Sequence, residues 1–326
     1  MSSVSSKELG KSPTISVVIP ILNEEDNLDQ LQQRLVASLN KCGVTFEIIY
    51  VDDGSEDQSF EILKEFSSQD NRVRVISFSR NFGHQIALTA GIDAAAGNAV
   101  VTMDGDLQHP PELIEELLES WREGFKIVYT VRTATKNISR FKKITSSLFY
   151  LLLNRLSDTK VEPNTSDFRL LDRKVVDVFK EIRERHRFFR GLVFWVGFNR
   201  QAVSFIADER HAGKKQYSFA KMALFALDGI VSFSNVPLLI SIYLGCTVSI
   251  FSFALALYFV YLRIAEGAFV SGVASVLVSL HFLCGIILIF IGVVGLYISR
   301  MYSEVKQRPL YVVSEKIGWE KTEKRA

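Results

Sequence analysis

The chain is poor in the features that mark several protein classes. It has only three cysteines, Cys42, Cys246 and Cys284, which are too few and too scattered for a disulfide scaffold. Its first fourteen residues are polar and contain no apolar core, so we expect no signal peptide there. The net charge of +2 does not indicate a nucleic-acid-binding protein. Because 48% of the residues are hydrophobic, a disordered chain is also excluded.

Charge is almost absent from one long region. Between Gly229 and Ser299 the only charged side chains are Arg263 and Glu266, which leaves the uncharged runs 237–262 and 273–298. Each run exceeds the roughly 20 residues that a membrane-spanning helix needs. Two buried core helices are the alternative, but core helices rarely extend so far without a polar face. The sequence therefore predicts a two-helix transmembrane hairpin within 229–299, with both chain ends on the same side.

The segment that follows the hairpin, 300–326, is basic. Seven Lys and Arg side chains stand there against four acids. Positive charge beside membrane spans is typical of the cytoplasmic side. We therefore expect an integral membrane protein with a basic cytoplasmic tail at 300–326 and a globular domain at 1–228, also cytoplasmic.

The charged two-thirds of the chain alternates between strand and helix patterns. Short apolar runs are followed by segments with apolar residues at helical spacing. Such alternation predicts an α/β fold, with a mostly parallel sheet and helices on both faces. Polar pairs follow three of the strands: Asn23 with Glu24, Asp52 with Asp53, and Asp104 with Asp106. Because ligands bind beyond the carboxyl ends of such strands, the three pairs should meet in one crevice. The expected strands are 15–19, 46–51, 73–78, 98–103 and 126–131, with helices after 23, over 62–66 and 85–96, and from 110 to 121.

The usual phosphate-binding glycine motifs are missing. No Gly-x-Gly-x-x-Gly follows the first expected strand, and the chain has no Gly-x-x-x-x-Gly-Lys-Ser/Thr loop. Phosphates in an acidic crevice need a divalent cation between them and the carboxylates. Oxygen ligands favour Mg²⁺ or Mn²⁺, and no Cys/His cluster indicates zinc.

Three motifs together resemble glycosyltransferase family 2. They are Val-Val-Ile-Pro-x-x-Asn-Glu-Glu at 17–25, Val-Asp-Asp-Gly-Ser at 51–55 and Met-Asp-Gly-Asp-Leu-Gln-His-Pro-Pro at 103–111. With Arg132, Phe168-Arg169 and two C-terminal spans, the chain is similar to the polyprenyl-phosphate sugar transferases, which include dolichol-phosphate mannose synthases and bactoprenol glucosyltransferases. The resemblance implies a GT-A (Rossmann-like) fold, a nucleotide-diphosphate sugar donor, a lipid-phosphate acceptor and inversion at the anomeric carbon. It also implies that 1–228 is the catalytic domain and that the protein lies in a bacterial inner membrane.

The acidic positions receive roles from this resemblance. Asp104 and Asp106 would hold the metal and act in catalysis, with a bend that Gly105 permits and Gln108 as a possible further contact. One acid of each pair could instead only cap the following helix. His84 and His109 flank the crevice. His109 could approach the metal, but a hydrogen bond at a helix start is its expected role. The residues expected to bind the nucleotide sugar are Pro20, Leu22, Glu24, Asp52, Asp53, Asp104 and Gln108.

Basic residues are expected to hold the lipid phosphate and the diphosphate. The set is Arg132, Arg140, Arg169, Arg210 and Lys215, of which Arg132 is also placed among the catalytic residues. Membrane-surface helices are expected near 139–158 and 218–234. The alternative role of these basic residues is simple attraction to anionic lipid headgroups. The loop Gly-Lys-Lys-Gln-Tyr at 213–217 departs from the family's Gly-Glu-Ser-Lys-Tyr, which leaves its diphosphate role open.

Asp167 is the remaining catalytic candidate. An alcohol acceptor would need a general base, but a phosphate monoester has a second pKa of about 6 and is largely dianionic at neutral pH. Asp167 is therefore expected to position the substrates rather than to remove a proton.

The best prediction of the reaction is transfer of glucose from UDP-glucose to undecaprenyl phosphate. Mannose from GDP-mannose and aminoarabinose from its UDP donor stay open. A polysaccharide synthase is disfavoured because Gln-x-x-Arg-Trp is absent, and a non-enzymatic membrane scaffold because Asp104 and Asp106 are intact. Gly285, Gly292 and Gly295 permit close helix approach, so a homo-oligomer remains possible.

Overall fold

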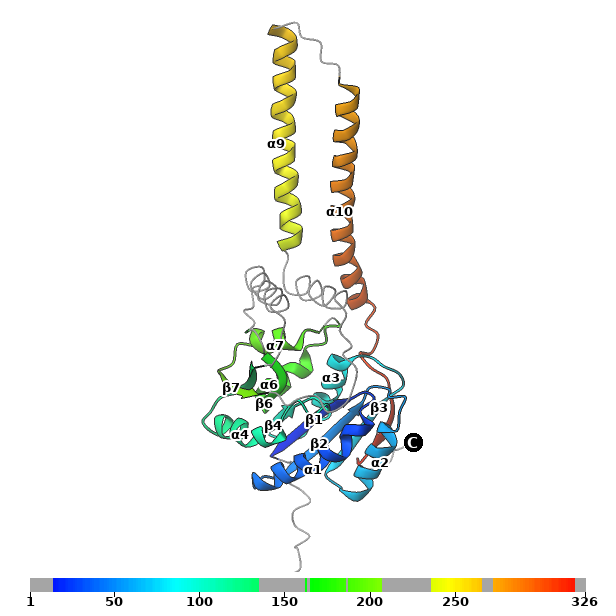
Figure 1. Ribbon diagram of the computed structural model, residues 1–326, viewed down its shortest axis with the longest axis vertical. Helices are drawn as coiled ribbons and strands as arrows, with labels where there is room; N and C mark the ends of the chain where they lie inside the picture. The colour runs from blue at the N-terminus through cyan, green and yellow to red at the C-terminus, as the bar shows by residue number, and fades with distance from the viewer. Residues whose placement is uncertain are drawn as a thin grey trace, which may run out of the picture.

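A computed structural model describes residues 14–134, 162, 165–185, 187–206, 236–265 and 272–319. The expected surface helices at 139–158 and 218–234 lie outside these residues, as do Arg140, Arg210 and Lys215. A mixed α/β domain carries two long helices that rise from it side by side (Figure 1).

The domain is built on one eight-stranded sheet, in the order β7-β5-β6-β4-β1-β2-β3-β8. Parallel pairing joins β1 to β2 and β4, β2 to β3, and β5 to β7. Antiparallel pairing joins β6 to β4 and β5, and β8 to β3. The strands are β1 Ile15–Ile21, β2 Phe46–Asp52, β3 Val73–Phe78, β4 Ala99–Thr102, β5 Ile127–Ala134, β6 Thr165–Asp172, β7 Arg200–Ile206 and β8 Val313–Ile317.

Helices cover both faces of the sheet, and each face has its own apolar cluster. Helices α1 (Glu25–Lys41), α2 (Ser59–Gln69) and α4 (Ile114–Arg122, preceded by the short η1, Pro111–Leu113) pack on one face. Helices α3 (His84–Ala94), α6 (Arg173–Glu181) and α7 (Phe189–Trp195) pack on the other. The predicted α/β class with helices on both faces is confirmed, and so is each strand and helix expected between residues 15 and 131.

Strand β1 lies at the centre of the sheet and is buried along its whole length. Its residues alternate between the two clusters: Val17 and Ile19 face α1, whereas Val18 faces α3. Helix α3 approaches β1 so closely that a Cβ atom on Gly91 would lie 2.1 Å from Val18 Cγ1. This close packing fixes the start of α3, at His84, beside the carboxyl ends of the strands.

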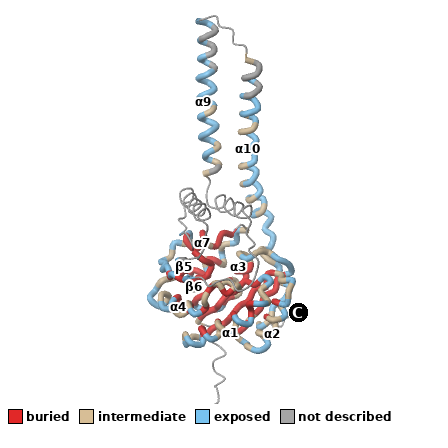
Figure 2. The backbone as a smooth tube through the Cα atoms, in the orientation of Figure 1, coloured by how far each residue is buried: buried red, intermediate tan, exposed pale blue. Residues whose placement is uncertain are grey.

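The two C-terminal helices, α9 (Val236–Ala265) and α10 (Val273–Val305), are long and apolar enough to cross a membrane. Their apolar windows have mean hydropathies of 2.1 and 2.6, and these windows are not buried inside the protein. Figure 2 shows the contrast between the buried strands of the domain and the exposed surface of these helices. Helix α10 extends beyond the expected end at residue 298 by about two turns.

The segment after α10 returns to the domain, which the sequence did not lead us to expect. Strand β8 pairs antiparallel with β3, and Val313 lies opposite Phe78 at the carboxyl end of β3. The Tyr311 ring stacks on Phe78, with centroids 5.2 Å apart. Helix α10 is therefore joined to the sheet at the carboxyl ends of the parallel strands, where the polar pairs follow.

Candidate active site

The loops after β1 and β2 are tied together by hydrogen bonds. The Asn23 amide donates to Ser55 Oγ (3.1 Å), and Asn23 Oδ1 accepts from the Glu56 amide (2.8 Å). The Glu24 amide donates to Ser59 Oγ (2.9 Å). Asn23 adopts a left-handed backbone with φ of 55°, a conformation that asparagine tolerates better than most residues. Of the three predicted donor-site residues here, Pro20 is buried in β1, Leu22 is exposed and Glu24 lies at the start of α1.

Asp52 and Asp53 are both buried and both use their carboxylates inside the protein. Asp52 accepts from the Ser55 amide (3.0 Å) and from Ser77 Oγ (2.8 Å). Asp53 accepts from the amides of Phe82 (2.7 Å) and Gly83 (2.9 Å), which fixes the loop before α3. Burial raises the pKa of Asp53, although these two amide contacts act in the opposite direction. The pair thus shapes the wall of the crevice by holding the loops that follow β2 and β3.

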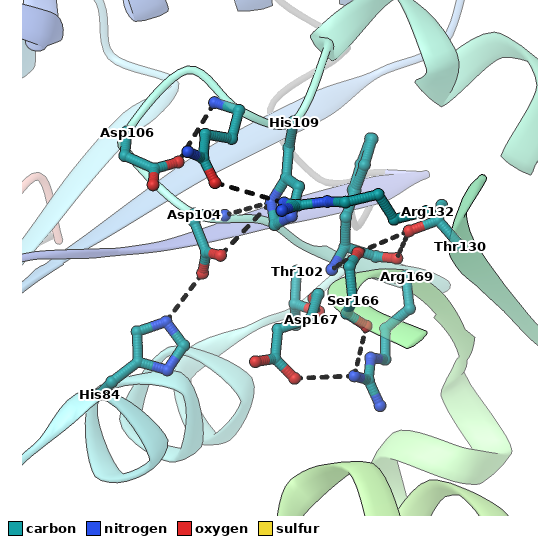
Figure 3. Close-up of polar contacts among 12 residues, drawn as sticks. His84, Thr102, Asp104, Asp106, His109, Thr130, Arg132, Ser166, Asp167 and Arg169 are labelled. Atoms are coloured by element: carbon teal, nitrogen blue, oxygen red, sulfur yellow. Dashed lines mark hydrogen bonds and ion pairs between the residues drawn. The ribbon is translucent and has the colours of Figure 1, made fainter. Parts of the chain in front are cut away.

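The loop after β4 carries Asp104 and Asp106 (Figure 3). We expected Gly105 to supply the bend, but its φ is not positive; its role is steric, since a Cβ there would lie 2.6 Å from Ile21 Cδ1. The left-handed residue is Leu107, with φ of 61°. Such a backbone costs a leucine roughly 1–2 kcal/mol. The Leu107 side chain is fully buried in the cluster beneath α1 and α4, which offsets this cost and fixes the loop.

Two histidines contact Asp104. His84 Nε2, at the first position of α3, lies 2.8 Å from Asp104 Oδ1, and this contact raises the pKa of His84 to about 9 against the opposing effect of burial. His109 is buried, stacks on Phe168, and accepts a hydrogen bond at Nδ1 from the Asp104 amide (3.0 Å). Burial lowers the pKa of His109, so the neutral ring accepts this bond. A hydrogen bond at a helix start was the expected role of His109; its ring instead accepts from the Asp104 amide, in the loop after β4.

Asp167, in β6, is held between two arginines. Arg169 Nη2 lies 2.8 Å from Asp167 Oδ1, and Arg190 Nη2 lies 3.1 Å from Asp167 Oδ2. Burial would raise the pKa of Asp167, but the charges of Arg190 and Arg169 outweigh it and hold the pKa below its usual range. Asp167 is consequently a carboxylate at neutral pH and a weak proton acceptor.

The two arginines differ in access. The Arg169 side chain is only 1% exposed; it donates to the Ser166 carbonyl (2.6 Å) and lies over the Phe189 ring. Arg190, from α7, is 31% exposed. Arg169 is therefore placed to position Asp167, whereas Arg190 can reach a ligand. Sequence reasoning missed Arg190 because it lies within the apolar run Phe188–Trp195, which predicts a core helix; a single arginine among aromatic residues was the available signal.

Arg132 approaches the crevice from β5. Its Nη2 donates to Gln108 Oε1 (3.3 Å), and its guanidinium lies 6.0 Å from the centre of the Phe205 ring. Gln108 is in turn held by its amide, which donates to Asp106 Oδ1 (3.1 Å). Strands β4, β5 and β6 thus bring five of the predicted residues together (Figure 3). They are Asp104, Asp106, Gln108, Arg132 and Asp167.

The donor set fits a divalent cation that is shared with a phosphate ligand. Within the described residues, no group of three or more His, Cys, Asp and Glu side chains could hold a metal alone. Mg²⁺ is typically bound through one or two carboxylates plus substrate phosphates and water, which is what Asp104 and Asp106 can offer. The partly exposed Asp104 carboxylate, 31% accessible, allows such a ligand to approach.

The model of Glycosyl transferase family 2 matches residues 16–179, which include all three acidic loops and Asp167. The chain belongs to glycosyltransferase family 2. Accordingly it is a glycosyltransferase, and the fold is the GT-A type that the motifs predicted.

Several family-2 relatives match over most of their length. The chain is 46% identical to an uncharacterized glycosyltransferase, YkcC, of Bacillus subtilis, over 94% of both chains. It is 46% identical to an uncharacterized glycosyltransferase, sll0501, of Synechocystis, over 94% of this chain and 96% of that one. It is 38% identical to a prophage-derived bactoprenol glucosyl transferase of Shigella flexneri, over 92% and 97%.

Among solved structures, glucosyl-3-phosphoglycerate synthase of Mycobacterium tuberculosis in complex with Mn²⁺ and UDP-glucose is similar to this chain. The match has 21% sequence identity and a TM-score of 0.46, and covers 67% of this chain and 78% of that one.

Proposed function

We propose that this enzyme transfers a hexose from a nucleotide-diphosphate sugar to the phosphate of a membrane polyprenyl phosphate, with inversion. UDP-glucose and undecaprenyl phosphate are the proposed substrates. Relatives named bactoprenol glucosyl transferase, 38% identical over nearly the whole chain, support this choice. The catalytic domain and both termini are proposed to lie on the cytoplasmic side, since nucleotide sugars are cytoplasmic metabolites and the tail is basic.

One observation carries the proposal. Asp104 and Asp106 follow β4, and Asp167 lies beside that end of β4, in β6. The connection from α10 enters β8 opposite Phe78, at the corresponding end of β3. A water-soluble, highly charged donor can enter such a crevice from solution, while an acceptor anchored in a bilayer can reach it from the membrane side. Neither the acidic crevice nor the adjoining helix alone would require a lipid acceptor. Because both occur at the same ends of the strands, a lipid acceptor is favoured.

Asp104 and Asp106 would hold a divalent cation, Mg²⁺ or Mn²⁺, which when bound neutralises the charge of the departing nucleotide diphosphate. His109 holds the backbone of Asp104, and Leu107 fixes the loop, so the two carboxylates are positioned before the donor binds. Preorganised charge of this kind needs little rearrangement during the reaction.

The acceptor phosphate needs cationic partners, because it approaches a crevice that holds three carboxylates. Among the described residues, Arg132 and Arg190 are the partly exposed arginines around Asp104 and Asp167. In this proposal they hold the phosphate, whose oxygen attacks the anomeric carbon as the bond to the nucleotide diphosphate breaks. Asp167 keeps Arg190 and the sugar in place, and the dianionic phosphate needs no general base.

A substitution tests whether Asp167 acts as a base. We expect Asp167→Asn to lower the transfer rate about 10- to 100-fold. The substitution loosens Arg190 and Arg169, but it removes no general base from the reaction. Rates measured from pH 5 to 9 should keep the acidic limb of the native enzyme, since the pKa of Asp167 is already low. Loss of that limb in Asp167→Asn would instead identify Asp167 as the base.

The function itself is tested with a panel of donors. The purified full chain would be incubated with radiolabelled UDP-, GDP- and dTDP-sugars, with and without undecaprenyl phosphate or dolichyl phosphate, and the lipid extract counted. The expected result is labelled lipid from UDP-glucose only when a polyprenyl phosphate is present. Labelled mannolipid from GDP-mannose, an aminoarabinose lipid, or no lipid product with any donor would each contradict the proposal.

A further inference from the structure

A second cavity lies where α10 joins the catalytic domain. Its volume is about 650 Å³, and its walls come from the end of α3, the segment after α6, and the connection from α10 to β8. The side chains that define it are Asp93, Arg183, Arg185, Glu304, Arg308 and Tyr311. None of them belongs to the crevice around Asp104, so the cavity is a separate site. We refer to it as the junction cavity.

Positive charge exceeds negative charge in the junction cavity. Asp93 is already engaged: Arg183 Nη1 lies 2.7 Å from its Oδ2, and the Tyr311 hydroxyl donates to the same oxygen at 3.1 Å. Glu304 Oε1 accepts from the backbone amide of Arg185 (2.8 Å). That leaves two guanidinium groups, on Arg185 and Arg308, against the single carboxylate of Glu304.

These two guanidiniums are poorly neutralised. Arg185 Nη2 donates to the backbone carbonyl of Arg308, a neutral acceptor. The exposed Arg308 side chain makes no hydrogen bond or ion pair with the described part of the chain. Guanidinium groups present a fork of donors that suits phosphate oxygens. A phosphate group is thus the ligand whose charge and acceptor atoms complement the cavity.

The position of the junction cavity along α10 indicates where this phosphate would come from. The uncharged run of α10 ends at Ile298, and the helix continues to Val305, about 10 Å further along its axis. The polar headgroup layer is roughly 5–8 Å thick on each side of a bilayer, so the cavity, which begins at Glu304 about 9 Å beyond Ile298, lies at the outer boundary of that layer. Met301 and Val305 remain 62% and 78% exposed on these last turns, so an apolar surface leads from the membrane toward the cavity.

From these observations we propose that the junction cavity binds the phosphate of an anionic phospholipid headgroup from the adjoining leaflet. The lipid would contact both α10 and the catalytic domain, because Arg308 follows α10 whereas Arg183 and Arg185 follow α6. A ligand that bridges the two parts stabilises their arrangement by mass action. The site does not depend on the identity of the sugar or of the acceptor, and its test does not require turnover.

The test uses the full chain in lipid nanodiscs made of phosphatidylcholine alone or with phosphatidylglycerol. The melting temperature and the phosphatidylglycerol retained in native mass spectrometry are measured for the native protein, Arg308→Gln and Arg300→Gln. Arg300→Gln is the matched control, because it removes one positive charge from the same helix end but outside the cavity lining. The exposed Arg308 side chain makes no hydrogen bond or ion pair with the described residues, and the contact from Arg185 is to the backbone carbonyl, so Arg308→Gln should leave the fold intact.

We expect phosphatidylglycerol to raise the melting temperature of the native protein and of Arg300→Gln. Arg308→Gln should weaken phosphatidylglycerol retention about tenfold, the loss expected for one charged hydrogen-bond partner. An equal effect of the two substitutions would reduce the cavity to general surface charge and overturn the proposal. Stabilisation by inorganic phosphate in phosphatidylcholine nanodiscs, at the level given by the lipid, would also overturn it by identifying a site for soluble anions.

Discussion

Replacing Asp104 with Asn should lower the transfer rate by roughly 10³-fold, the largest effect of any single substitution in the crevice. The change removes a negative ligand from the proposed cation site and weakens the contact with His84, 2.8 Å away. Glycosyl transfer to lipid would be measured over a Mn²⁺ titration, and higher Mn²⁺ should restore part of the rate. A chelator should abolish the activity of the native enzyme, and added Mg²⁺ or Mn²⁺ should restore it.

Asp70→Asn is a suitable control for Asp104→Asn. Asp70 also forms an ion pair, with Arg72 at 2.7 Å, but it precedes β3 and so lies at the opposite end of the sheet. Its replacement should leave the transfer rate within about twofold, as for a surface ion pair. If Asp104→Asn kept native turnover and native metal dependence while remaining folded, the assignment of Asp104 to the metal would be wrong.

Replacing Arg190 with Gln should lower kcat/KM for the polyprenyl phosphate by about 10²-fold, with little change in the KM for the donor. The physical reason is the loss of a charged partner for the acceptor phosphate, an interaction that strengthens as negative charge gathers in the crevice. Arg190→Lys should recover part of this loss, because it keeps the charge but not the forked geometry. Initial rates would be measured while each substrate is varied at saturation of the other.

A double-substitution cycle separates the two roles open to Arg190. If Arg190 only holds Asp167, to which it lies 3.1 Å away, then Arg190→Gln should have no further effect in an Asp167→Asn background. If Arg190 binds the acceptor phosphate, its loss should still raise the KM for the lipid in that background. The first result would remove Arg190 from the phosphate site and leave it as a positioning residue.

The first half of the fold follows from local sequence patterns. Strands β1 to β4 are short apolar runs that alternate with helices, and the predicted polar pairs stand at the ends of three of them, β1, β2 and β4. Parallel strands of this kind can be recognised in the sequence as continuous apolar runs, because both of their faces are buried. The acidic crevice could be predicted for the same reason, since parallel strands bring their carboxyl ends to one edge.

Strands β6 and β8 could not be predicted in this way. Strand β6 places the charged side chains of Asp167 and Arg169 in the interior, where they neutralise each other, so its sequence reads as a polar motif rather than a buried strand. Strand β8 is a short edge strand, Val-Ser-Glu-Lys-Ile, that forms only by pairing with the distant β3. The directions of the β6 side chains could not be predicted either. Phe168 faces the apolar cluster of α1 and α4, and because neighbouring strand residues point to opposite faces, Asp167 and Arg169 face α7.

The return of the chain to the sheet makes the hairpin an insertion within the catalytic domain rather than an appendage to it. During synthesis, β3 emerges long before β8, and its open edge stays unpaired until both α9 and α10 have been made. An unpaired edge is a template for association with other chains. Completion of the sheet therefore requires that the two long helices be translated first, and a chain cut after residue 228 would lack the strand that pairs with β3. Such a truncated protein should be more prone to aggregate than the full chain, for reasons that have nothing to do with the apolar helices themselves.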